Sequence, residues 1–207
     1  MKSFFLFLFC VISSLCFSQQ TEEFRNVKNY YNHHRLLLNN EFKKKYETET
    51  NILSKDAIKN DFLFFMKKMD SIENTALIGA LLKVKNLEDL GKLHNKNIIQ
   101  GNQPDLISVT EKSADYPGGI NALRQEVANL FYTEGVYAEE KTVKANVAFI
   151  VEKDGTVSNV QAQGTNFTFN RQAEIAIYSV SEKFSPAIFK GNTVRYRFKL
   201  PLTMTFD

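Results

Sequence analysis

Few residues in this 207-residue sequence could carry out chemistry on a substrate. The histidines are His33, His34 and His94, and the cysteines are Cys10 and Cys16. Residues 101–207 therefore contain neither histidine nor cysteine, which removes Cys–His and Ser–His nucleophilic pairs from that half. His33 and His34 are neighbours, so on a helix their side chains diverge by about 100° and rarely bind one metal ion. The sequence predicts no catalytic residue, no metal site and no cofactor.

The remaining polar clusters fit a solvated surface better than a reactive site. Glu22-Glu23, Glu88-Asp89 and Glu139-Glu140 are acid pairs, but a catalytic dyad requires a cleft and a shifted pKa. Gly118-Gly119 could receive an anion at a helix start, yet no Walker or dinucleotide spacing accompanies it. With 26 Lys and Arg against 23 Asp and Glu, the net charge of +3 gives no electrostatic case for nucleic acid or an anionic membrane. We therefore predict that the protein is not an enzyme.

Residues 1–18 are predicted to be a signal peptide. Lys2 is followed by an apolar run over 4–17, which contains both cysteines and is short for a membrane span of about 20 residues. Cleavage after Ser18 would give a periplasmic or secreted protein that contains no thiol. The alternative is an uncleaved segment that anchors the protein in the inner membrane.

The rest of the chain divides into a helical region (19–100), a linker (101–115) and a second domain (116–207). In residues 19–100, apolar residues recur at intervals of three and four positions, which predicts three or four short helices in a small bundle. We expect Ser54 to cap the second of these helices and Asn86 to begin a short last one. No proline occurs in this region, whereas the turn-rich stretch around Pro104 indicates a boundary.

The second domain alternates between helical and strand periodicity. The pattern predicts a helix over 120–131, strands over 142–152 and 157–163, a helix capped by Asn170, and a long strand over 194–206. Asp154-Gly155 is a hairpin signal between the first two strands. The fold class is therefore α+β, with a three-stranded antiparallel sheet that carries two helices on one face.

The last strand is the candidate binding site. Because it is the longest, we expect part of it to overhang its partner. Pro201 confines this part of it to a sheet edge or a bulge, since proline cannot donate a ladder hydrogen bond. Arg195, Arg197 and Lys199 keep its outer face soluble. Such an edge can capture an extended peptide, although an ordinary edge protected by charge is the alternative. The candidate residues are Val194, Arg195, Tyr196, Arg197, Phe198, Lys199 and Leu200.

Several motifs occur in an order that resembles a known family. Tyr116-Pro117-Gly118-Gly119 precedes the first helix, Asp154-Gly155 joins two strands, Phe184-Ser185-Pro186-Ala187 follows the second helix, and Lys199–Phe206 ends the last strand. Residues 116–206 thereby resemble the C-terminal domain of TonB. The resemblance implies a periplasmic module that binds the plug segment of an outer-membrane TonB-dependent receptor, which pairs with the strand at about 194–200.

The chain departs from the energy transducers of that family in two respects. Its hydrophobic start has the features of a cleavable segment, and 19–100 lacks the long proline-rich spacer. We therefore expect an exported peptide-binding protein that takes part in TonB-dependent transmembrane transport, with other envelope proteins or a second copy at the edge strand as further partners. The alternatives are an adaptor whose helical half recruits a partner, and a membrane-anchored transducer.

Overall fold

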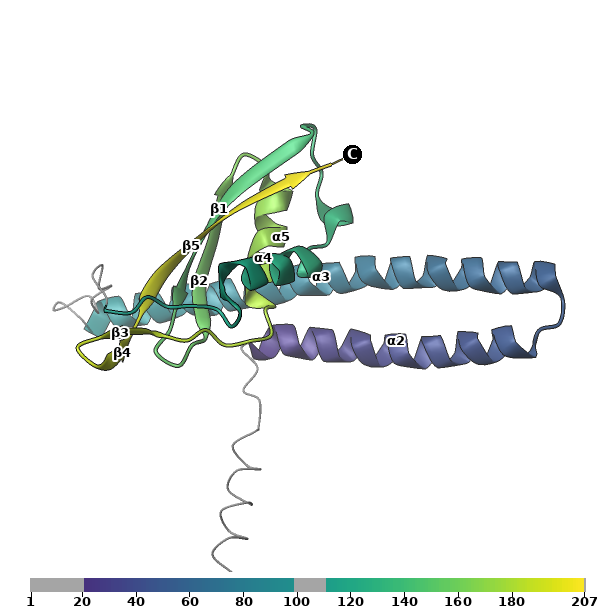
Figure 1. The fold of residues 1–207 in the computed structure, drawn as a ribbon, viewed down its shortest axis with the longest axis horizontal. Coiled ribbons are helices and arrows are strands. Elements are labelled where there is room, and N and C mark those ends of the chain that lie inside the picture. Colours follow the sequence, from purple (N-terminus) through teal and green to yellow (C-terminus); the bar gives the residue numbers. More distant parts are fainter. Residues whose placement is uncertain (1–20, 99–110, 207) are drawn as a thin grey trace, which may run out of the picture.

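The computed structural model describes residues 21–98 and 111–206 (Figure 1). The predicted signal peptide and most of the predicted linker lie outside these residues. Within the described ranges, no helix is both long and apolar enough to cross a membrane.

The fold is α+β, as the sequence predicts. A hairpin of two long helices precedes a domain built on a three-stranded antiparallel sheet (Figure 1). We call residues 111–206 the sheet domain. The elements in chain order are α2 (Glu22–Thr48), α3 (Ile52–Ile98), α4 (Gly119–Leu130), a short 3-10 turn (Thr133–Gly135), β1 (Thr142–Val151), β2 (Val157–Gly164), α5 (Phe167–Tyr178), β3 (Ala187–Phe189), β4 (Asn192–Val194) and β5 (Tyr196–Thr205).

The prediction of three or four short helices in a bundle is wrong. Two helices of 27 and 47 residues form an antiparallel hairpin instead. Asn86, the expected start of a last short helix, lies inside α3. Polar residues separate the apolar turns along α3, and no proline interrupts its backbone hydrogen bonding.

Both predicted helix caps are also wrong. The Asn51 side chain accepts hydrogen bonds from the backbone N–H groups of Leu53 and Ser54, at 2.9 and 3.2 Å, so Asn51 rather than Ser54 begins α3. In α5 the cap is Asn166, whose Oδ1 accepts from the Phe169 N–H at 2.8 Å. Each true cap is an asparagine three or four residues ahead of the residue that the sequence favoured.

The three-stranded sheet has the order β2-β1-β5, so β1 is central and β5 is an edge strand. The predicted overhang of the last strand is wrong, because Tyr196–Thr205 pairs along its whole length with Val151–Thr142. Side chains of β1 alternate between buried and more exposed, and its buried face is covered by α5, against which α4 packs. The two helices thus lie on one face of the sheet, as the element order predicts.

The hairpin and the sheet domain share one hydrophobic core. Phe24 of α2 stacks on Tyr178 of α5 with ring centroids 5.5 Å apart. Leu77, Leu81 and Val84 of α3 belong to the same buried cluster as the inner face of the sheet. The other end of the hairpin projects well beyond the sheet domain (Figure 1).

Candidate peptide-binding edge

The seven predicted site residues fall on three consecutive parts of the chain. Val194 ends β4 and pairs with Ala187 of β3, in a small two-stranded hairpin. Arg195 belongs to neither strand, and residues 196–200 form the first half of β5. The chain therefore changes its pairing partner at Arg195, from β3 to β1.

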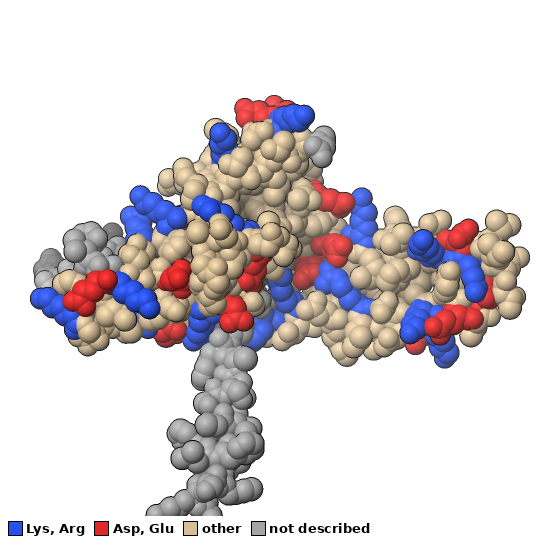
Figure 2. Space-filling model, in the orientation of Figure 1, with Lys and Arg blue, Asp and Glu red and all other residues tan. Residues whose placement is uncertain are grey.

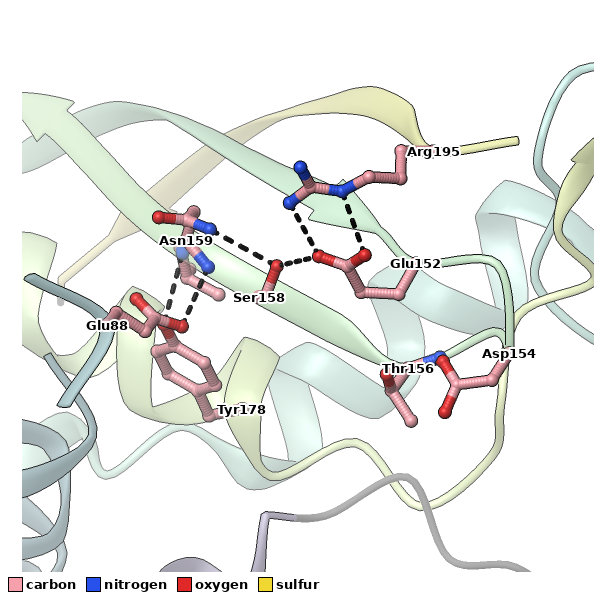
Figure 3. Close-up of polar contacts among 9 residues, drawn as sticks. Glu88, Glu152, Asp154, Thr156, Ser158, Asn159, Tyr178 and Arg195 are labelled. Carbon is pink, nitrogen blue, oxygen red and sulfur yellow. Dashed lines mark hydrogen bonds and ion pairs between the residues drawn. The ribbon is translucent and has the colours of Figure 1, made fainter. Parts of the chain in front are cut away.

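Arg195 is held at this change of partner by Glu152, which follows the end of β1. Its Nε and Nη2 donate to the two carboxylate oxygens at 2.9 and 2.8 Å, a bidentate ion pair (Figure 3). The Glu152 carboxylate also accepts from the Ser158 hydroxyl. Of the three cations predicted on this strand, Arg195 therefore positions the strand, while Arg197 and Lys199 remain exposed.

The pairing register shows which backbone groups of β5 face outward. The Phe206 N–H donates to the Lys141 carbonyl at 2.8 Å, so 206 and 141 form a hydrogen-bonded pair. Because such pairs alternate along an antiparallel ladder, even-numbered residues of β5 bond to β1 and odd-numbered residues direct their N–H and C=O groups outward. Among the residues described, no partner meets the outward groups of Arg197, Lys199, Thr203 and Thr205. Pro201 occupies an outward position, where a missing N–H costs no bond to β1.

The side chains of β5 divide between its two faces in the same alternation. Phe198 stacks on Phe149 of β1, with centroids 5.1 Å apart, and Leu200 is fully buried. Arg197, Lys199 and Thr203 are exposed on the opposite face. Figure 2 shows Lys and Arg side chains on the sheet domain, and acidic and basic side chains together at its upper tip.

A groove of about 280 Å³ lies between α4 and the second half of β5. Its lining is mainly apolar and consists of Arg124, Val127, Ala128, Phe131, Phe169, Pro201, Leu202, Thr203 and Met204. None of these residues is in the predicted site, which ends at Leu200. In the sequence, the α4 side of the groove is visible only as the apolar stripe of the predicted helix over 120–131. The sequence does not show that this helix lies beside the last strand.

The other sheet edge, β2, differs from β5 because side-chain oxygen atoms already accept hydrogen bonds from its backbone N–H groups. The N–H of Asn159 donates to Glu88 Oε1 at 2.8 Å (Figure 3). The N–H of Val160 donates to the Tyr178 hydroxyl at 3.1 Å, and that of Ala162 donates to Glu174 Oε1 at 3.0 Å. The Tyr178 hydroxyl in turn donates to Glu88 at 2.8 Å. These acceptors come from α3 and α5, and they compete with any strand that would add at β2.

Charges within this network are compensated. Glu174 is almost fully buried and is paired with Lys85 of α3 at 2.7 Å and with Arg171. Burial raises the pKa of Tyr178, and the neighbouring Glu88 carboxylate raises that pKa further, so the hydroxyl stays protonated and keeps donating. The β2 edge is therefore covered by a stable hydrogen-bond network that involves the helical hairpin.

The structure brings together two of the motifs that carry the resemblance. The Tyr116 ring packs edge-on against Phe184 at 5.0 Å. Asp115 and Ser185 exchange backbone hydrogen bonds of 3.1 and 2.8 Å. The segments before α4 and after α5 are thus neighbours, and together they support the chain that leads into β3, β4 and β5.

Over residues 21–98 and 111–206 the fold is an α+β module in which side chains occupy one sheet edge and no described residue pairs with the other. Comparison with known proteins identifies no relative: no family model, no curated protein and no solved structure matches this chain. In the described part of the chain, no group of three or more His, Cys, Asp or Glu side chains could hold a metal ion.

Proposed function

We propose that this protein binds an extended peptide segment by strand addition to the open edge of β5. The observation that carries the proposal is the difference between the two sheet edges. Three amides of β2 already donate to Glu88, Tyr178 and Glu174, whereas the outward groups of β5 meet no partner among the described residues. A sheet with one covered and one uncovered edge can accept a strand on one side only.

The groove beside β5 gives such a strand a place for its side chains. In strand addition the backbone hydrogen bonds supply affinity and alternate side chains supply specificity. A side chain of the added strand that points toward α4 would contact Val127, Phe131 and Met204. A side chain on the other face would lie near Arg197 and Lys199, which are exposed.

The partner that we propose is the plug segment of an outer-membrane receptor, so that the protein takes part in TonB-dependent transmembrane transport in the periplasm. This part of the proposal rests on the resemblance of residues 116–206 to the TonB C-terminal domain, and is supported by the contact between the Tyr116 and Phe184 motifs. The open edge and groove agree with a binding module and assign no chemical reaction.

The proposal is tested with the chain from Gln19 to Asp207, which keeps every described residue. Isotope-labelled protein titrated with receptor plug peptides should show amide shifts at Arg197, Lys199 and Thr203, and those amides should become protected from hydrogen exchange. Lys199→Pro removes one outward N–H without removing a bond to β1, so it should weaken binding about tenfold.

Lys199→Ala is the matched control, because it removes the same side chain and keeps the N–H. It should bind within about threefold of the wild type. Circular dichroism melting of both variants establishes that the fold is kept. Absence of shifts along β5 with plug peptides at about millimolar concentration would overturn the proposal, as would equal binding by the proline and alanine variants.

A further inference from the structure

The strands of the three-stranded sheet contain cations and no acidic residue. The charged side chains of β1, β2 and β5 are Lys144, Arg197 and Lys199. All three are exposed on the face of the sheet that the helices leave uncovered. None of them forms an ion pair with another described residue. Their positive charge is therefore available to a ligand.

The acidic residues that flank β1 do not neutralise this face. Glu152, which follows β1, is already held by Arg195 in a bidentate ion pair. Glu139 and Glu140 precede β1 at the other end of the sheet, where residue 142 pairs with residue 205. At about 3.3 Å per residue, that end lies roughly 25 Å along β5 from Arg197.

Arg197 and Lys199 are the two cations next to the open edge. Residues of an added strand lie directly across from those of β5, and side chains that are directly opposite share a face, with Cβ atoms about 5 Å apart. The ligand residues across from Arg197 and Lys199 therefore point to the uncovered face, within reach of the guanidinium and the ammonium group. Opposite charges at such cross-strand positions stabilise the pairing, and like charges destabilise it.

The other face of the same edge is apolar, and it is open further along the strand. Leu202 and Met204 line the groove beside α4. Leu200 is fully buried, and the Phe198 ring packs against Phe149 and Phe184. The groove therefore leaves room for ligand side chains across from Leu202 and Met204.

We infer that the bound segment carries acidic residues across from Arg197 and Lys199, and apolar residues across from Leu202 and Met204. This inference rests on the proposed function, because it specifies the peptide that the β5 edge binds. Counted from the residue across from Arg197, the acidic residues are the first and third and the apolar residues are the sixth and eighth. The order runs from the N to the C terminus in a ligand parallel to β5, and in reverse in an antiparallel one.

The experiment titrates the chain from Gln19 to Asp207 with capped peptides that span these eight positions. Two peptides carry glutamate at the first and third positions and leucine at the sixth and eighth, one in each chain direction. Threonine fills the remaining positions because it favours strands. Two further peptides carry lysine in place of glutamate. We expect the better glutamate peptide to bind about tenfold more tightly than its lysine counterpart, with a preference that shrinks as salt is added.

Charge reversal in the protein supplies the converse test. The double variant Arg197→Glu with Lys199→Glu should prefer the lysine peptide over the glutamate peptide. Lys144→Glu is the matched control, because Lys144 lies on the same face but on β1, one strand further from the ligand. At about 10 Å its effect is screened by salt, so this variant should keep the preference for glutamate. Circular dichroism melting establishes that each variant is folded.

The apolar positions are tested by moving the two leucines of the glutamate peptide to the fifth and seventh positions. These leucines then point to the uncovered face instead of the groove, so affinity should fall about tenfold. Equal binding of glutamate and lysine peptides with amide shifts along β5 would overturn this inference and leave strand addition intact. An unchanged preference in the double variant would also overturn it. If receptor plug peptides shift the β5 amides and none of the designed peptides does, the inference alone fails; if neither set does, the proposed function fails with it.

Discussion

At the scale of single residues, the β1–β2 turn depends on a glycine for two reasons. Gly155 has a φ of 82°, in the left-handed region that disfavours a side chain. Its carbonyl accepts a hydrogen bond of 3.0 Å from the Phe184 N–H, and a Cβ built on Gly155 would lie 2.2 Å from the Phe184 carbonyl oxygen. Phe184 is itself buried against Tyr116 and Phe198, so it cannot move aside freely.

We therefore predict that Gly155→Ala lowers the free energy of unfolding by about 3 kcal/mol or more, since strain in φ and a backbone clash act together. Gly191→Ala separates the two effects. Gly191 has a φ of 72° but open space around an added Cβ, so it should lose only about 1 to 2 kcal/mol. Urea denaturation measures both values. Similar losses for the two variants would mean that the contact with Phe184 relaxes without cost.

At the scale of elements, the helix starts show where local sequence rules reach their limit. Ser54 and Asn170 have suitable side chains and precede apolar stripes, but each lies inside a helix that begins earlier. Asn170 instead donates from its side chain to the Gly164 carbonyl at 3.0 Å, which ties α5 to the end of β2. Several polar residues in succession could cap a helix, and the tertiary contacts of the neighbouring turns decide which of them does so.

The caps give a prediction for α3. Asn51→Ala should lower the free energy of unfolding by about 1 kcal/mol, because two backbone N–H groups lose their acceptor. Ser54→Ala should change it by less than about 0.5 kcal/mol, because Ser54 lies past the start of the helix. Chemical denaturation of the two variants side by side provides the measurement. The reverse order of effects would assign the cap to Ser54.

Strands were easier to predict than helices because the patterns that indicate them, alternation of apolar residues and a tight turn, lie within a few consecutive residues. The alternation over 142–152 and 194–206 and the Asp154-Gly155 turn correspond to β1, β5 and the hairpin that the structure contains. The one-sided apolar pattern also predicted that the helices cover a single face. The length of α3 and the α4–β5 groove were not predicted, since both depend on which elements pack together. Five of the seven candidate site residues lie on β5, while Val194 lies on β4 and Arg195 between the two strands. The helix that flanks β5 was not part of the predicted site.

At the scale of the whole molecule, the helical half and the sheet half differ in amino-acid composition but share one hydrophobic core. Leu81 is 1% exposed and belongs to the same buried cluster as Val147, Phe149 and Leu200 of the sheet. Polar contacts across the same junction, such as Lys85 with Glu174 and Gln172 with Asn74 at 2.7 Å, fix how the hairpin meets the sheet domain. A change in α3 should therefore affect the stability of β1, β2 and β5.

Leu81→Ala tests this coupling. Removal of a fully buried leucine should lower the free energy of unfolding by about 2 to 5 kcal/mol. The loss should be the same whether unfolding is followed by helical circular dichroism or by hydrogen exchange of amides in β1, because a shared core unfolds in one cooperative transition.

Leu87→Ala is the control: Leu87 lies in the same helix but is 53% exposed, so its loss should stay within about 0.5 kcal/mol. If Leu81→Ala weakened the helical signal and left exchange in β1 unchanged, the hairpin would be a separate unit. The Glu88 and Tyr178 network would then be unable to keep the β2 edge covered once the hairpin opened, and both edges of the sheet would accept a strand.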